Sequence, residues 1–181
     1  LSEWFEVEVS QNGHIHRQRF ERGNIATDLE IVGDTDATGT FIKFKADPEI
    51  FTETTVYEYE VLQRRLREQA FLNAGLSITL TDKRDPENII EENFCYEGGI
   101  KSFVDYINTS RGLTPVVDEI MHFTTVNGDR SAEVSISYND GYNEIILSFA
   151  NGVRTIDGGT HENGFKTALT RVFNEYGRKF K

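Results

Sequence analysis

The sequence predicts an α+β protein built of two-layer sandwiches, in which mostly antiparallel sheets carry helices on one face. A segment of alternating apolar and polar residues adjoins each of two turn pairs, Asn12 with Gly13 and Asn127 with Gly128, and such pairs are typical of β-hairpins. Three longer segments have apolar residues at helical spacing. Because the hairpins are grouped together, the pattern favours antiparallel sheets covered by helices.

The composition indicates a folded protein that does not enter a membrane. The chain has 181 residues, of which 38% are hydrophobic and 13 are Phe, so it can bury a core and is not a disordered tail. No apolar run is long enough for a membrane span, and the first residues lack the features of a signal peptide. Cys95 is the single cysteine, which excludes an internal disulfide framework and favours a reducing, cytoplasmic location.

The charge balance limits how the chain could contact nucleic acid. It has 19 Lys and Arg against 30 Asp and Glu, a net charge of -11, so DNA contact is expected only at local basic clusters. Two clusters occur on predicted helices: Arg64, Arg65 and Arg67, and then Arg171, Arg178, Lys179 and Lys181. A solvated helix face and a phosphate track are both consistent with them. In the first cluster, Arg64 is expected to pair with Glu60 and Glu68.

The first half is predicted to contain four strands, then a helix, then two more strands. The predicted strands cover residues 4–9, 14–22, 29–32, 40–45, 76–81 and 89–96. The helix is expected to begin at Thr55, because Glu58 completes a capping box. It is expected to end near Gly75, which permits a left-handed cap. One helix cannot cover both faces of the sheet that these strands imply, so this half looks incomplete.

Gly98 and Gly99 mark the predicted boundary between two domains, residues 1–97 and residues 98–181, because paired glycines allow a hinge. The second domain is expected to begin with an amphipathic helix. Its apolar face consists of Ile100, Phe103, Val104 and Ile107. Three strands and a final helix are predicted to follow, at residues 119–126, 130–138, 144–150 and 160–178.

Several short patterns have a chemical and a structural interpretation. His14 and His16 share one strand face, but a metal site needs more ligands, so a solvated hairpin is favoured. Cys95 has no positioned base nearby and is interpreted as an inert core residue. Residues 38–40 open a strand and do not form a Walker loop. Residues 158–161 precede a helix whose N-terminus would suit an anion, although capping by Thr160 is favoured on pattern alone.

Longer motifs resemble the B subunits of bacterial DNA gyrase, which are ATPase subunits of type IIA topoisomerases. They lie at residues 33–40, 47–51, 65–73, 96–104, 148–151, 158–166 and 168–171. The motifs follow the family's order and span nearly the whole chain. The topoisomerase IV homologue is a close alternative, but residues 13–18 and 27–33 are more similar to gyrase.

This resemblance implies a piece of a larger ATP-driven enzyme. Residues 1–97 would be the second half of a GHKL-type ATPase domain, and residues 98–181 the first part of a ribosomal-protein-like transducer domain. The parent would use ATP and Mg2+ for negative supercoiling by double-strand passage, with the transducer coupling gate closure to DNA transport. Its partners would be double-stranded DNA, the gyrase A subunit and a second B subunit, in an A2B2 assembly.

The resemblance also implies that the catalytic machinery lies outside this chain. The catalytic Glu, the metal-binding Asn, the adenine-binding Asp and the ATP lid would precede Leu1, and the Gln-Thr-Lys loop would follow Lys181. Without them, the general base and the phosphate cradle are missing. The isolated chain is therefore expected to bind no cofactor and to hydrolyse no ATP.

Three residues match positions that have roles in this family. Thr40 matches the Thr at the floor of the adenine pocket, and Ile42 matches an apolar wall where aminocoumarin inhibitors bind. Lys166 matches a basic position in the cavity that admits transported DNA, where a cation can meet a phosphate without reading bases. Gln11 departs from the Arg at the pocket mouth, which bears on aminocoumarin binding, and Gly152 replaces an Asn, which could loosen that corner.

Two further interpretations remain consistent with the sequence. A truncated module that only docks or dimerises would also lack the lid and the base, and a genuine start codon at Leu1 would favour it. An upstream reading frame with a glycine-rich lid would favour the gyrase piece. A relative of the MutL repair ATPases shares the architecture, but residues 158–161 argue against it.

Overall fold

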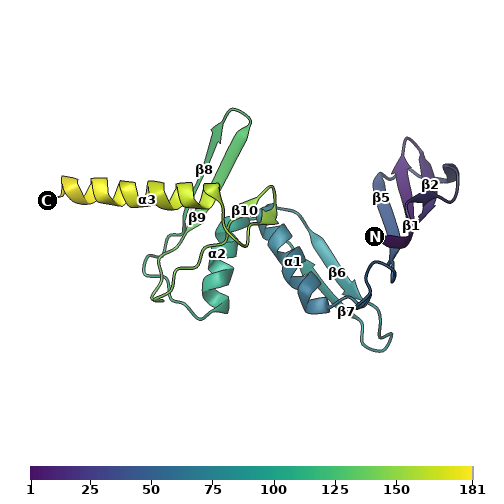
Figure 1. Cartoon of the computed structure of the whole chain (residues 1–181), viewed down its shortest axis with the longest axis horizontal. Coiled ribbons are helices and arrows are strands. Elements are labelled where there is room, and N and C mark those ends of the chain that lie inside the picture. Colours follow the sequence, from purple (N-terminus) through teal and green to yellow (C-terminus); the bar gives the residue numbers. More distant parts are fainter. Residues whose placement is uncertain (181) are drawn as a thin grey trace. The chain divides into compact units, whose positions relative to one another are not determined.

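The computed structural model describes residues 1–180, which form two compact units that meet in the sequence at Glu58 and Tyr59 (Figure 1). Unit 1 is a sheet, and unit 2 combines helices with three small antiparallel hairpins. Every strand pairing within residues 1–180 is antiparallel. The α+β prediction with antiparallel sheets is therefore confirmed. Among the described helices, none combines the length and the hydropathy needed to cross a membrane.

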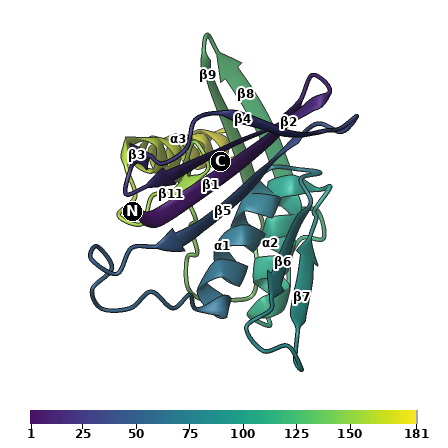
Figure 2. The same cartoon turned by 90° about the vertical axis from the view of Figure 1, so that its right-hand side faces the viewer.

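Unit 1 is a five-stranded sheet with the order β3-β2-β1-β5, in which β4 also pairs with β2. Its strands are β1 (Ser2–Gln11), β2 (His14–Glu21), β3 (Asn24–Ile25), β4 (Glu30–Asp34) and β5 (Gly39–Ala46). Figure 2 shows β1, β2 and β5 side by side. Asn12 and Gly13 have φ values of 55° and 85°, so the predicted hairpin turn is confirmed. Arg22 and Gly23 form a similar turn into β3, a strand that the sequence did not predict.

The strand register gathers the apolar side chains of unit 1 on one face. Phe5 lies opposite Phe20 on β2 and Phe44 on β5, and Val7 lies opposite Ile42. Directly opposite residues of antiparallel strands share a face. The side chains of Phe44 and Ile42 nevertheless remain 52% and 51% exposed. Within unit 1, this face is therefore open.

The segment after β5 is irregular as far as Glu58, so the predicted helix start at Thr55 is wrong. Instead of capping a helix, the hydroxyl of Thr54 accepts a hydrogen bond from the Val56 N–H at 3.0 Å. Such local side-chain hydrogen bonds compete with helix formation. The helix begins four residues later, at Tyr59.

Unit 2 begins with a helix that contacts both a hairpin and a second helix. The first helix is α1 (Tyr59–Leu72), the hairpin is β6 (Ile78–Asp82) with β7 (Ile90–Phe94), and the second helix is α2 (Gly99–Ser110) (Figure 2). Phe71 is 1% exposed and stacks on Tyr96 and Phe103, with ring centroids 3.6 and 4.6 Å apart. Phe94 is also buried. Rings from α1, from α2 and from the segment after β7 therefore form one aromatic core.

The predicted hinge glycines lie beside this core. Gly99 is buried with a φ of 55°, and a Cβ atom there would meet the Ala74 Cβ at 3.4 Å. The N–H groups of Gly75 and Gly99 both donate to the carbonyl of Tyr96. Residues on either side of Gly98 thus pack together in unit 2.

The remaining elements of unit 2 are two hairpins and a long helix. They are β8 (Met121–Asn127) with β9 (Arg130–Ile136), β10 (Phe149–Ala150) with β11 (Val153–Arg154), and α3 (Thr160–Lys179). The predicted strand at residues 144–150 is wrong apart from its last two residues, Phe149 and Ala150, which pair with Arg154 and Val153 of β11. The predicted final helix is confirmed, and Figure 1 shows α3 as a single straight helix.

Candidate functional site

Thr40 and Ile42 lie on the open apolar face of unit 1. In β5, Thr40 pairs with Val9 and Ile42 with Val7 on the neighbouring strand β1. Since alternate residues of a strand point to the same face, Thr40, Ile42 and Phe44 form one row. The structure therefore brings together the two residues predicted for a nucleotide pocket, on a half-exposed surface.

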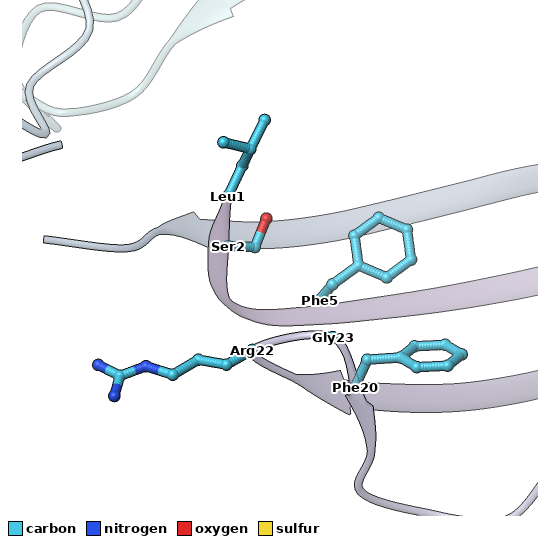
Figure 3. Close-up of a pocket in the computed structure, with 6 residues that line it drawn as sticks. All are labelled: Leu1, Ser2, Phe5, Phe20, Arg22 and Gly23. Atoms are coloured by element: carbon cyan, nitrogen blue, oxygen red, sulfur yellow. The ribbon is translucent and has the colours of Figure 1, made fainter. Parts of the chain in front are cut away.

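A shallow hollow opens at the other end of this face. Its volume is about 340 Å³, and it is lined by Leu1, Ser2, Phe5, Phe20, Arg22 and Gly23. Figure 3 shows the rings of Phe5 and Phe20 on the same side of the sheet, while the guanidinium of Arg22 points away from them. The hollow is therefore apolar and does not include Thr40 or Ile42.

Arg22 is held by the turn that follows β5. Its Nε lies 3.0 Å from Oδ2 of Asp47, and its Nη2 lies 2.7 Å from Oε1 of Glu49. Asp47 is buried, and its carbonyl accepts hydrogen bonds from the N–H groups of Ile50 and Phe51. Residues 47–51 form one of the motifs that resemble the gyrase B subunits. Their structural role here is to hold Arg22 in place.

Lys166 lies in the second turn of α3 and is held by two carboxylates. Its Nζ lies 3.0 Å from Oε1 of Glu162 and 3.1 Å from Oε1 of Glu144. The hydrogen bond to Glu162, and to a smaller extent the one to Glu144, raises the pKa of the Lys166 ammonium above its ordinary value. The predicted DNA-contacting cation is therefore paired with carboxylates in this structure.

Glu162 is the centre of a polar network that joins α3 to the hairpin β10–β11. The hydroxyl of Ser148 donates to Oε2 of Glu162 at 2.6 Å and lies 2.7 Å from Oγ1 of Thr155. Oγ1 of Thr155 lies 3.2 Å from Nε2 of His161. The hydrogen bond from Ser148, followed by that from Lys166, lowers the pKa of the Glu162 carboxyl. Glu162 therefore stays ionised next to Lys166.

The N-terminus of α3 differs from the favoured interpretation. Gly159 occupies the N-cap position without a side-chain hydrogen bond, and Thr160 is the first helical residue, so capping by Thr160 is wrong. Gly158 has a φ of 73°, which favours glycine. Glu162 supplies the negative charge that a helix N-terminus favours.

Arg67, one residue of the basic cluster on α1, has a structural role. Arg67 donates to Oε1 of Glu92 at 2.7 Å and to the hydroxyl of Tyr106 at 2.9 Å. Its guanidinium carbon also lies over the rings of Phe94 and Tyr106, 5.2 and 5.3 Å from their centroids. Arg67 is partly buried and paired, so neither interpretation of the basic cluster, a solvated helix face or a phosphate track, describes it.

Glu68 pairs differently from the prediction. It forms ion pairs with Arg65 at 3.3 Å and with Arg154 at 3.7 Å, whereas no ion pair with Arg64 occurs among the described residues. Next to it, Nε2 of Gln69 donates to the carbonyl of Gly152 at 2.8 Å. The corner at Gly152 is therefore tied to α1.

The remaining patterns have simple outcomes. Nδ1 of His14 lies 2.8 Å from Oδ1 of Asp34 on the paired strand β4, and the described residues contain no group of three His, Cys, Asp or Glu that could hold a metal ion. Cys95 is exposed, so its interpretation as a core residue is wrong. It follows the buried Phe94 at the end of β7, where the side chains of successive residues point to opposite sides.

The two carboxylates around Lys166 were not among the predicted site residues. Glu162 precedes Lys166 by four residues on a helix, a spacing that indicates an ion pair. Glu144 lies far from Lys166 in the sequence, in a segment without regular structure. No local pattern could have linked it to Lys166.

Comparisons with known proteins agree with the resemblance found in the sequence. A family model described as DNA gyrase B matches residues 99–181. The B subunit of DNA gyrase from Staphylococcus aureus is 51% identical over all 181 residues, and so is that from Staphylococcus epidermidis. The chain spans 28% of the length of these relatives.

A solved structure extends this agreement to the fold. The 43K ATPase domain of Thermus thermophilus gyrase B, in complex with an aminocoumarin, superposes with a TM-score of 0.84 at 37% sequence identity. The match covers 99% of this chain and 48% of that domain. By sequence and by fold, the chain therefore belongs to the DNA gyrase B family, in which it corresponds to a segment of the whole protein.

Proposed function

We propose that this chain is a working part of the ATPase subunit of a DNA gyrase. The parent would couple ATP hydrolysis to negative supercoiling by double-strand passage. Its partners would be double-stranded DNA, the A subunit and a second B subunit. The observation that carries the proposal is the open apolar face of unit 1, because a one-layer sheet whose apolar side chains stay half exposed calls for a second layer. The superposition on about half of a gyrase ATPase domain supports the same conclusion.

The proposal assigns residues 1–97 to the ATPase domain and residues 98–181 to the transducer. The family model starts at residue 99, which supports this boundary. The compact units divide elsewhere, at Glu58. In the proposal, α1 and the hairpin β6–β7 belong to the ATPase domain. Because α1 packs on the first transducer helix α2, it provides a rigid connection between the domains.

Thr40 and Ile42 are proposed to form part of the adenine pocket. Their common face and their exposure fit a surface that a nucleotide base could cover. The aminocoumarin bound by the Thermus domain supports a pocket for such inhibitors in the complete protein. Gln11, at the end of β1, is the residue whose departure from the family bears on that binding.

Among the described residues, no three His, Cys, Asp or Glu side chains are grouped to hold a metal ion. In the proposal, the Mg2+ ligands and the catalytic groups belong to the rest of the parent protein. The proposal therefore places no catalytic step on this chain. Its residues would contribute pocket walls, the contact to transported DNA and the mechanical link between domains.

The test compares the complete ATPase subunit with the isolated chain. The complete ATPase subunit together with its A subunit is expected to supercoil relaxed plasmid DNA in the presence of ATP. The isolated 181-residue chain is expected to show no Mg2+-dependent ATP turnover, measured by phosphate release. Preferential decatenation would favour the topoisomerase IV alternative. Turnover by the pure chain would contradict the assignment of the catalytic groups to the rest of the protein.

A further inference from the structure

We propose that Glu144 is a competing carboxylate that occupies Lys166 and has to leave before Lys166 can contact a DNA phosphate, whereas Glu162 is a positioning residue that holds Lys166 in place. The inference rests on the proposed function, in which Lys166 faces the transported DNA. It adds two residues to that contact and assigns them different roles.

The charges around Lys166 show why a competitor matters. One ammonium lies within 3.1 Å of two carboxylate oxygens from different residues. Two negative charges and one positive charge leave the cluster with a net charge of about -1 at neutral pH. Such a cluster repels a phosphate, and the contact becomes favourable only when one carboxylate withdraws.

The two carboxylates are not equivalent, and their surroundings show which one leaves. The Glu162 side chain is 17% exposed, lies on the same helix as Lys166 and accepts a hydrogen bond from Ser148. The Glu144 side chain is 70% exposed and lies in a segment without regular secondary structure. An exposed ion pair contributes little free energy, so Glu144 is the carboxylate that a phosphate displaces.

The exchange keeps the charge around Lys166 constant. A DNA phosphate carries one negative charge, as Glu144 does, so the ammonium passes from one anion to another while Glu162 stays. Contact with DNA would thereby release the segment that carries Glu144. Because this segment leads into β10, whose hairpin contacts α1 through Gly152 and Gln69, the exchange lies next to the link between the proposed domains.

The experiment uses the complete ATPase subunit with its A subunit, and measures the concentration of a linear DNA duplex that gives half-maximal stimulation of ATP turnover. Glu144→Gln is expected to lower this concentration about two- to fivefold, the range that corresponds to an exposed ion pair. Glu162→Gln is expected not to lower it, because the variant removes the same charge but also loosens Lys166. Glu175→Gln is the matched control, because it removes one charge from an exposed position of α3 that forms no ion pair with a described residue.

The Lys166→Ala background separates the inference from the proposed function. Lys166→Ala alone is expected to raise the half-maximal DNA concentration and to reduce its salt dependence by about one contact. On this background, Glu144→Gln is expected to have no effect. If Lys166→Ala changes nothing, the DNA contact of the proposed function is wrong. If Lys166→Ala weakens the response but Glu144→Gln does not strengthen it, or acts equally without Lys166, or is matched by Glu175→Gln, the competing role of Glu144 is wrong.

Discussion

The two units place their apolar side chains in opposite ways. In unit 1 the one buried residue is Asp47, and large apolar residues such as Ile42 and Phe44 stay about half exposed. In unit 2, Phe71 on α1, Phe94 on β7 and Phe103 on α2 are buried. The structure describes all residues of unit 1. This unit is held together by the backbone hydrogen bonds between its strands, whereas the first part of unit 2 has a core of its own. The two units should therefore respond differently to the loss of an aromatic ring.

The largest difference is expected for Phe71→Ala. Because this buried ring stacks on two others, its removal leaves a cavity and should destabilise unit 2 by about 3–5 kcal/mol. Phe44→Ala, at a half-exposed position of unit 1, should cost less than about 1 kcal/mol. Native-state hydrogen exchange read by mass spectrometry reports each unit separately. Equal losses of protection in the two variants would show that unit 1 buries Phe44 as fully as unit 2 buries Phe71.

A smaller effect is expected for Arg67→Ala. The change removes the partner of Glu92 and a contact to two aromatic rings, and should cost about 2 kcal/mol. Arg64→Ala on the exposed side of the same helix should change stability by less than about 0.5 kcal/mol. Urea denaturation of both variants measures the difference. Similar stability losses in the two variants would show that Arg67 is a solvated surface residue and not part of the core.

The smallest expected effect is the pH dependence of stability that Glu92 contributes to unit 2. The hydrogen bond from Gln63, followed by that from Arg67, lowers the pKa of the Glu92 carboxyl below its ordinary value of 4.5. The unfolded chain therefore takes up this proton first as the pH falls, so the stabilisation is complete well above pH 4.5 and is lost below it. The Glu92 side chain is 33% exposed, so its contribution should be below about 1 kcal/mol.

Stability measured from neutral pH down to acid should reveal this contribution in unit 2. Glu92→Gln should be less stable than the unaltered chain at neutral pH and should lose less stability on acidification. Gln63→Ala removes the main hydrogen-bond donor and should move the loss to higher pH. If Glu92→Gln keeps the full acid loss, other carboxylates such as Glu162 are responsible for it.

Several failures of prediction have a common physical cause. Thr55 with Glu58 had the residues of a capping box, but the chain there forms a local turn at Thr54. Residues 144–150 were predicted as a strand, yet only Phe149 and Ala150 find partners, Arg154 and Val153 of β11. Arg64 was well spaced to pair with Glu68, but Arg65 and Arg154 hold that carboxylate instead. In each case a competing partner, or the lack of one, overrode the local pattern.

In the candidate site, too, the sequence indicated single residues, whereas the fold created the contacts between them. The resemblance placed Thr40, Ile42 and Lys166, and the structure places the first two on one sheet face. The two carboxylates that pair with Lys166 could not both be foreseen, because Glu144 reaches it only through the fold.

By itself, the sequence determined the antiparallel hairpins, the amphipathic helices and the membership of a family. These depend on turn residues, on local periodicity and on linear motifs, all of which act over short stretches of chain. Only the tertiary structure decided that Arg67 stabilises the core, that Gly152 is tied to Gln69 and that Lys166 is held by Glu144. Such contacts join residues far apart in the sequence, and their energies depend on burial and on competing partners, which no local pattern encodes.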